Sequence, residues 1–147
     1  MTEGRPDPLR DLLITAARTL RRRWFTALEP WQLSPHEYRA LRVIDRGPAD
    51  SCPGDRPEVP RLGDVAKALR IAPRSATEVV DRLEERGLAE RVPDAGDRRA
   101  VCVRLTAEGR RVVAELDTAR DADAEDYFAA LDERDRAELR RILDKLH

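Results

Sequence analysis

Arginine and hydroxyl side chains gather at one end of a short predicted helix that runs from Pro73 to Arg86. The apolar residues of this segment recur at helical spacing and must face a core, which leaves a separate polar face. Short hydroxyls and forked guanidinium donors can read base edges in the major groove of DNA, and a helix N-terminus favours a phosphate. An ordinary solvated helix face fits the same pattern. The polar face consists of Arg74, Ser75, Thr77, Glu78, Asp81 and Arg82.

A second cluster lies in the sequence Asp-Ala-Gly-Asp-Arg-Arg at residues 94–99, where turn residues precede two adjacent arginines. An arginine at the tip of a hairpin can enter a narrow minor groove, where the negative potential is strongest. A carboxylate can hold a guanidinium by two parallel hydrogen bonds, so we expect Asp97 to orient Arg99, with Arg98 between them. The alternative is a turn whose arginines only keep it soluble.

The elements that must position these clusters follow from apolar periodicity and helix caps. An apolar stripe predicts a helix over 8–29, and a Ser34–Glu37 capping box opens a second helix that ends near Arg46. The Gly- and Pro-rich residues 47–60 predict a long loop. Further helices are expected over 62–69, 73–86, from a Thr106 cap to about 130, and after an Asp132 cap.

Two short strands, over 88–92 and 100–105, are predicted to form a β-hairpin. The alternation places Val101, Val103 and Leu105 on one face of the second strand, with Cys102 on the opposite face as inert packing. Two short helices joined by a three-residue turn and followed by a hairpin describe a winged helix-turn-helix. The expected fold class is therefore mainly α with a small β-hairpin wing.

Charge is balanced over the chain but unevenly distributed. The 147 residues carry 28 basic and 29 acidic side chains, which argues against a bulk nucleic-acid binder. Residues 61–111, however, hold 12 basic and 9 acidic side chains, and residues 112–147 hold 6 and 11. A basic middle and an acidic end would orient the molecule on a polyanion.

Composition also excludes several classes of protein. No apolar run approaches the roughly 18 residues of a membrane span, and the first residues lack the apolar stretch of an export signal. Two cysteines fifty positions apart form neither a disulfide framework nor a metal ligand set, so a cytoplasmic location is expected. There is no phosphate-binding glycine loop and no nucleophile elbow, which indicates a protein that is not an enzyme and needs no cofactor.

The combined motifs resemble the MarR family of bacterial transcriptional regulators. The resemblance covers about residues 61–112 and rests on L-G-D-V-A at 62–66, D-R-L-E-E-R-G-L at 81–88, D-R-R-A at 97–100 and L-T-A-E-G at 105–109. Two features depart from the family pattern. Ala72 stands where a serine cap is common, and the loop over 48–60 is longer than usual.

The resemblance implies a single domain over 1–147, with a winged helix-turn-helix lobe at 34–105 and dimerisation helices at 8–30 and 106–147. It implies a homodimeric repressor on a pseudo-palindromic operator in double-stranded DNA. Carried onto this chain, the recognition helix is 73–86 and the wing tip contains the Asp-x-Arg motif. The candidate DNA contacts are then Arg74, Ser75, Thr77, Glu78, Arg82, Asp97, Arg98 and Arg99.

Release from DNA by a small aromatic or phenolic ligand is a further expectation. Aromatic groups near the corner between the first two helices could line an apolar cleft, although packing of that corner explains them equally well. The candidates are Trp24, Trp31, His36 and Tyr38. Two other functions stay open: a winged-helix module that contacts proteins instead of DNA, and a thiol-based redox regulator that would use Cys52. No metal is expected, because Glu37 is accounted for by the capping box.

Overall fold

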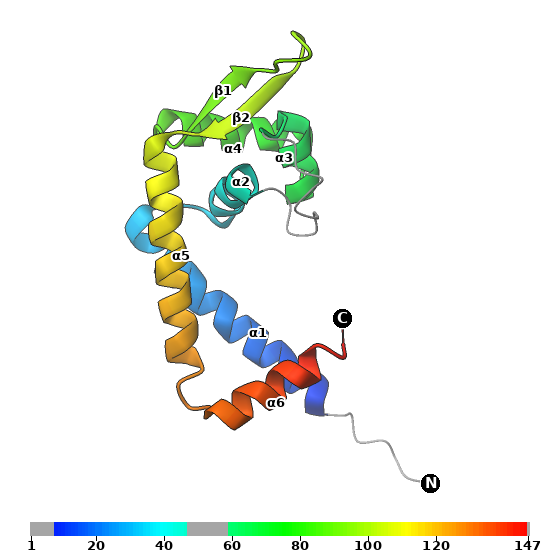
Figure 1. Ribbon diagram of the computed structural model, residues 1–147, viewed down its shortest axis with the longest axis vertical. Helices are drawn as coiled ribbons and strands as arrows, with labels where there is room; N and C mark the ends of the chain where they lie inside the picture. The colour runs from blue at the N-terminus through cyan, green and yellow to red at the C-terminus, as the bar shows by residue number, and fades with distance from the viewer. Residues whose placement is uncertain (1–7, 47–58, 147) are drawn as a thin grey trace. The chain divides into compact units, whose positions relative to one another are not determined.

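Helix caps and apolar stripes produce a mainly helical chain with one β-hairpin, as predicted (Figure 1). The computed structural model describes residues 8–46 and 59–146. The predicted long loop, including Cys52, therefore lies almost entirely outside the described residues. In chain order the elements are α1 (Pro8–Ala27), the 3₁₀ helix η1 (Glu29–Trp31), α2 (Pro35–Arg46), α3 (Leu62–Leu69), α4 (Pro73–Glu85), β1 (Ala89–Pro93), β2 (Val101–Leu105), α5 (Ala107–Tyr127) and α6 (Glu133–Leu143).

The chain divides into two compact units. One unit comprises residues 30–117 and contains α2, α3, α4, the hairpin and the first part of α5. The other unit comprises the residues up to 29 together with those from 118 onward, and contains α1, the end of α5 and α6. The candidate DNA contacts all belong to the 30–117 unit.

Local hydrogen bonds fix where the helices begin. At α2 the predicted capping box forms, because the Glu37 amide donates to Ser34 Oγ at 3.2 Å and the Ser34 amide donates to the Glu37 carboxylate at 2.6 Å. At α5 the predicted cap also forms, with the Gly109 amide donating to Thr106 Oγ1 at 3.0 Å. Each cap satisfies amides that the first turn of a helix leaves without a partner.

The core of the 30–117 unit lies between α2, α3, α4 and the hairpin. Helices α2 and α3 each turn an apolar face into this core. The buried residues on these faces are Tyr38, Leu41, Ile44, Val65, Ala66 and Leu69. Burying one such aliphatic side chain stabilises the fold by roughly 1.5–3 kcal/mol. The large side chains of this unit that are almost completely buried are Leu41, Val65, Leu69, Val80, Leu83, Val103 and Leu116.

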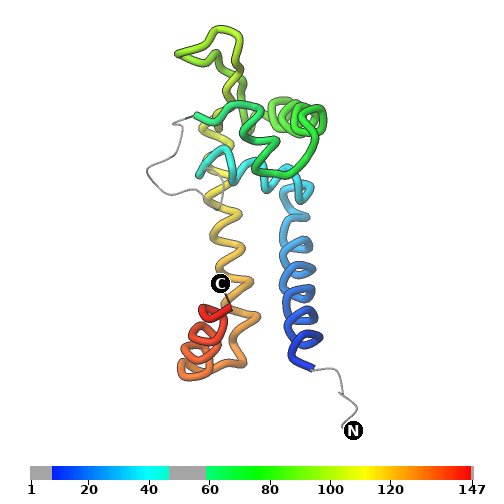
Figure 2. The backbone as a smooth tube through the Cα atoms, turned by 90° about the vertical axis from the view of Figure 1, so that its right-hand side faces the viewer, coloured from blue at the N-terminus to red at the C-terminus, as the bar shows by residue number. Residues whose placement is uncertain are grey.

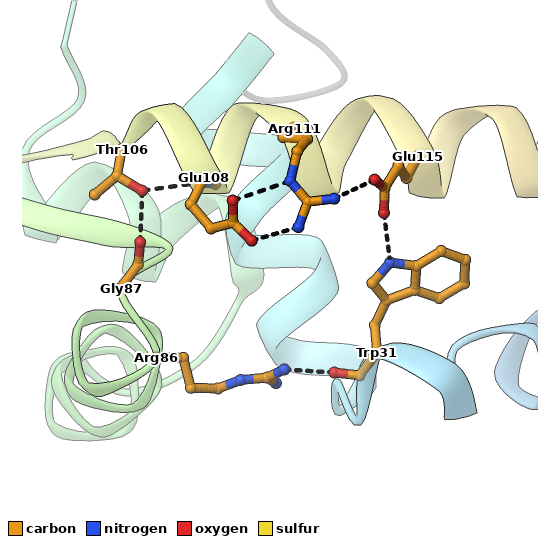
Figure 3. Close-up of polar contacts among 8 residues, drawn as sticks. Trp31, Arg86, Gly87, Thr106, Glu108, Arg111 and Glu115 are labelled. Atoms are coloured by element: carbon orange, nitrogen blue, oxygen red, sulfur yellow. Dashed lines mark hydrogen bonds and ion pairs between the residues drawn. The ribbon is translucent and has the colours of Figure 1, made fainter.

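The turn after α4 and the start of α5 require glycine at two positions. Gly87 has a φ of +69°, a left-handed conformation that glycine adopts without strain. At Gly109 a Cβ atom would lie 1.9 Å from the carbonyl oxygen of Leu88. Thr106 Oγ1 donates to the Gly87 carbonyl at 2.6 Å (Figure 3). The R-G-L and L-T-A-E-G motifs thus seat the start of α5 directly against the turn that follows α4.

The hairpin pairs β1 with β2 in antiparallel register, with Ala89 opposite Leu105. Val103 and Leu105 are buried, and so is Cys102, at 6% exposure. Val101 is 41% exposed, although the alternation predicts the same face for it as for Val103 and Leu105.

Neighbours along the second strand explain this burial. The Val103 amide donates to the Pro60 carbonyl at 2.9 Å, and an isolated antiparallel bridge joins Arg61 to Cys102. The segment before α3 therefore lies along β2 at these residues. Val101 lies closer to the end of the hairpin, which projects away from α3 and α4 in both views (Figures 1 and 2).

In the other unit, α1 and α6 leave apolar side chains exposed. Leu9 and Leu12 on α1 are 67% and 63% exposed, and Ile142 and Leu146 at the end of the chain are 44% and 65% exposed. The predicted stripes exist, but they are not covered within this unit. No helix among the described residues combines the length and the apolar character that crossing a membrane requires.

Polar contacts hold α5 in the same unit. The Arg23 guanidinium, within a run of three arginines, donates to Asp123 at 2.9 Å and also binds Asp126. This arginine therefore pairs with α5 instead of pointing freely into solvent. The predicted cap of α6 is confirmed, with the Asp135 amide donating to Asp132 at 2.8 Å.

Candidate nucleic-acid interface

Helix α4 presents a polar face opposite its buried stripe. Ala76, Val79, Val80 and Leu83 are at most 5% exposed, as the apolar spacing predicts. The five predicted contacts on this helix lie on the remaining surface, and all of them except the half-buried Thr77 are exposed. The Arg74 side chain is 93% exposed and reaches Glu78 only at 3.8 Å, a distance at which an exposed ion pair contributes little. Arg74 is thus available to an incoming partner.

The first turn of α4 offers backbone donors beside these side chains. Ala72 precedes the helix without a side-chain cap and Pro73 occupies its first position, as expected from the sequence. Proline has no amide hydrogen, so the next two amides, of Arg74 and Ser75, are the ones without an acceptor inside the helix. The Thr77 hydroxyl donates back to the Pro73 carbonyl at 3.1 Å. An uncapped helix start of this kind suits a phosphate oxygen.

One side chain that the sequence pattern does not identify reduces the negative charge of α4. Arg91, on β1, donates to Asp81 at 2.6 Å, and both its guanidinium and its backbone amide bind Glu84. Burial alone would lower the pKa of Arg91, but the hydrogen bonds that it donates to Asp81 and Glu84 outweigh burial and raise this pKa above its ordinary value. The single positive charge of Arg91 thereby offsets one of the two negative charges that would repel a polyanion. The sequence held one signal that could have identified Arg91, namely an arginine on a predicted strand next to a helix with acidic residues.

The wing tip, defined as residues 94–100, carries two free guanidinium groups. Arg98 and Arg99 are exposed, and among the described residues neither guanidinium has a hydrogen-bond or ion-pair partner. The prediction that Asp97 binds the Arg99 guanidinium is wrong. The Asp97 carboxylate instead accepts from the Arg99 backbone amide at 2.9 Å. An acceptor two residues before an amide reaches it without ordering a long side chain, so the local bond wins.

The aromatic residues predicted to line a ligand pocket occupy different environments. Trp31 is half-buried and its indole N–H donates to Glu115 at 3.3 Å, while Tyr38 is buried and His36 is exposed. Trp24 belongs to the other unit. Two cavities among the described residues, one on α3 and β2 and one on α5 and α6, are lined by none of these four predicted residues. The ligand pocket therefore stays a prediction.

Trp31 is held from two sides within the 30–117 unit (Figure 3). On α5, Arg111 pairs with both Glu108 and Glu115, and Glu115 also accepts from the Trp31 indole. From the end of α4, the Arg86 guanidinium donates to the Trp31 carbonyl. These contacts fix η1 against α5 and against α4, which carries candidate DNA contacts.

The two cysteines differ in what can be said of them. Cys52 lies outside the described residues. Burial and then the neighbouring Asp94 raise the pKa of the Cys102 thiol, which disfavours the reactive thiolate. The interpretation of Cys102 as inert packing therefore agrees with its environment.

Comparison with known proteins gives the interface a context. A family model described as "MarR family" matches residues 31–100. An HTH-type transcriptional repressor of Mycobacterium tuberculosis is 28% identical over 140 residues, which cover 95% of this chain and 93% of that protein. The transcriptional regulator YsmB of Bacillus subtilis, described as uncharacterized, is 32% identical over 85 residues, 58% of each chain. The chain spans 58–66% of the length of the first three curated relatives that it matches.

A solved structure shares the fold over nearly the whole chain. This structure is of a MarR mutant from E. coli complexed with operator DNA, and it superposes with a TM-score of 0.69 at 21% identity. The superposition covers 95% of this chain and 93% of that one.

Proposed function

Because this chain belongs to the MarR family, we propose that it is a transcriptional regulator that binds double-stranded DNA through α4 and the wing tip. One observation carries the proposal. Four exposed side chains on α4 and two unpaired guanidinium groups at the wing tip belong to the same compact unit, and among the described residues no hydrogen bond or ion pair ties these side chains to another element. The operator complex of the related MarR protein supports it.

In this proposal α4 enters the major groove. Arg74 and Arg82 offer forked donors that match the acceptor pair of guanine, and Glu78 offers an acceptor for the amino group of cytosine. Ser75 and Thr77 supply hydroxyl groups. The uncapped amides at the start of the helix hold a backbone phosphate, which sets the register without reading sequence.

The wing tip takes the adjacent minor groove. Arg98 and Arg99 are long, free and carried at the end of a projecting hairpin, which suits a narrow groove of negative potential. Asp97 contributes by fixing the backbone of Arg99.

We further propose that the protein acts as a homodimeric repressor on a pseudo-palindromic operator. The exposed leucines of α1 and the exposed apolar residues of α6 form the kind of surface that a second copy covers. Two copies of α4 related by a two-fold axis would read half-sites about one helical turn apart. A small aromatic ligand near Trp31, His36 and Tyr38 would release DNA only if it bound the two states of the dimer unequally.

The proposal is tested by fluorescence anisotropy on DNA from upstream of the gene itself, against a scrambled duplex, across a salt series. Binding that resists the scrambled competitor and falls steeply with salt is expected. Arg74→Ala should weaken binding to the upstream DNA, whereas Arg134→Ala, an exposed arginine on α6, serves as the matched control.

Weak binding that is equal on both duplexes and insensitive to salt would contradict the proposal. That outcome would favour the second candidate, a winged-helix module that contacts another protein. The wing arginines argue against it, because a protein interface tends to bury its central side chains and has little use for two free cations at a projecting tip.

A further inference from the structure

The carboxylate of Asp94 joins three parts of the 30–117 unit. Its Oδ1 atom accepts from the backbone amides of Gly96 at 2.7 Å and Asp97 at 3.3 Å. Its Oδ2 atom accepts from Arg61 Nε at 2.7 Å and lies 3.6 Å from the Cys102 Sγ atom. The Asp94 side chain is only 16% exposed although the turn beside it is open to solvent. One side chain therefore contacts the wing tip, the start of α3 and β2.

Little else holds the wing tip in place. The residues from 95 to 99 are all exposed, so burial of apolar surface does not fix this turn. Two backbone hydrogen bonds close it, from Asp94 to the Ala100 carbonyl at 3.2 Å and from Ala100 to the Asp97 carbonyl at 3.0 Å. The direction of the two tip arginines therefore depends on polar contacts, of which Asp94 makes the largest number.

The partner of Asp94 belongs to a rigid element. Arg61 precedes α3, and its backbone amide donates to Asp64 at 3.0 Å in the first turn of that helix. The helix is anchored by Val65 and Leu69, which are 0% and 2% exposed. Because the end of this helix is anchored, an ion pair with it can hold the exposed turn in a fixed position.

We propose that Asp94 positions the wing tip for DNA binding, and that its pairing with Arg61 couples the wing tip to α3. This inference rests on the proposed function for its DNA role. Asp94 is a positioning residue, since it acts through Arg98 and Arg99. Arg61 acts through Asp94 and makes no contact of its own with phosphate.

The charge states needed for this coupling hold across the usual pH range. The Gly96 amide and then the Arg61 guanidinium hold the pKa of Asp94 below its ordinary value, and Asp94 in turn raises the pKa of Arg61. The neighbouring Cys102 thiol stays protonated, because burial and Asp94 raise its pKa. Asp97 also raises the pKa of Arg61 through its charge, but among the described residues the carboxylate that accepts a hydrogen bond from Arg61 Nε is that of Asp94.

A double-mutant cycle separates positioning from direct contact. On the DNA duplex used above, Asp94→Ala should lower affinity about tenfold and Arg61→Ala about threefold, since a charge-assisted hydrogen bond is lost in each. The double variant should bind no more weakly than Asp94→Ala alone. Arg104→Ala, which removes an arginine paired with Glu90 on the same hairpin, is the matched control and should stay within about twofold of the unsubstituted protein.

Direct phosphate contact by Arg61 predicts a different result. Arg61→Ala would then weaken binding equally in both backgrounds and reduce the salt slope by about one. That outcome would overturn the coupling. Asp94→Asn separates the two contacts of this side chain, because asparagine keeps the acceptor for the turn amides but loses the charge that holds Arg61. The DNA affinity of this variant should therefore match that of Arg61→Ala.

A measurement on the protein without DNA keeps the two hypotheses distinguishable. Hydrogen exchange of the Gly96 and Asp97 amides should accelerate several-fold in Arg61→Ala and further in Asp94→Ala, while the amides of α4 stay unchanged. Unchanged exchange of these two amides in Arg61→Ala would overturn the coupling whatever the DNA result. Faster exchange in a protein that binds no DNA would overturn the proposed function and the DNA role of Asp94, while it would support the coupling.

Discussion

Helix α4 and the wing tip offer similar groups to DNA but are positioned by different physics. The polar face of α4 is fixed because Ala76, Val80 and Leu83 on its other side are completely buried. The wing tip buries none of the residues from 95 to 99 and depends on hydrogen bonds to Asp94 and Asp97. Burial of apolar side chains fixes the orientation of a whole helix, whereas a few hydrogen bonds fix the conformation of one turn.

The difference teaches where sequence changes matter in each region. In α4, buried residues and residues proposed to contact DNA alternate along the helix, so neighbouring substitutions should have unrelated consequences. In the wing tip, Asp94 and Asp97 fix the backbone that carries the proposed DNA contacts Arg98 and Arg99. A change there should alter DNA affinity while leaving the stability of the core intact.

The largest effect is expected from Leu83→Ala in α4. Leu83 is completely buried, and its truncation should cost about 2–5 kcal/mol of unfolding free energy through lost burial and the cavity left behind. The adjacent Arg82→Ala should change stability by no more than about 0.5 kcal/mol but should weaken DNA binding. Urea denaturation at a fixed protein concentration measures the first effect, and anisotropy measures the second. Similar stability losses in both variants would show that α4 does not separate the two roles.

The next effect is expected at the wing tip, from Arg99→Ala. Loss of one base-contacting arginine should lower DNA affinity about 10- to 100-fold. The melting temperature should stay unchanged, because the Arg99 guanidinium has no partner among the described residues. Arg134→Ala on α6 serves as the charge-matched control. Unaltered affinity of Arg99→Ala at physiological salt would remove this arginine from the interface.

A smaller effect is expected from Arg91→Ala, because Arg91 on β1 pairs with two carboxylates of α4. This change would leave Asp81 and Glu84 without their cation and would expose a bound polyanion to two carboxylates. DNA affinity should fall about three- to tenfold, as like-charge contacts across an interface predict. Asp81→Asn combined with Glu84→Gln in the same background should restore most of the affinity. No recovery in that combination would mean that Arg91 acts through the hairpin backbone instead of through charge.

The sequence predicted those features that depend on neighbours a few residues apart. The capping box at Ser34 and Glu37 and the cap at Thr106 are bonds over three residues, so the pattern alone identifies them. The buried stripe of α4 follows from helical spacing in the same way. The order of the elements and the winged fold then followed from the order of these local signals.

The sequence does not predict features that depend on distant partners or on the competition of two groups for one acceptor. Arg61 lies 33 residues before Asp94, and no periodicity connects them. The pairing of Asp97 with the Arg99 side chain was a reasonable expectation from residue types, but the backbone amide of the same residue competes for the carboxylate. The exposure of Val101 has the same origin, because alternation along a strand does not reveal where the strand leaves its neighbours.

The smallest effect sharpens the comparison without any DNA. The folded pKa of Asp94 lies below its ordinary value, so the contribution of its contacts is complete above the unfolded pKa and is lost as pH falls through the folded pKa. Acidification should therefore loosen the wing tip, while the buried stripe of α4, which contains no titratable group, is unaffected by this titration. The Gly96 amide shift followed by NMR should titrate with a midpoint below the ordinary aspartate value, and Arg61→Ala should move that midpoint upward. In the unsubstituted protein, a titration midpoint at or above the ordinary aspartate pKa would mean that the contacts of Asp94 do not hold the wing tip. The contrast with α4 would then fail.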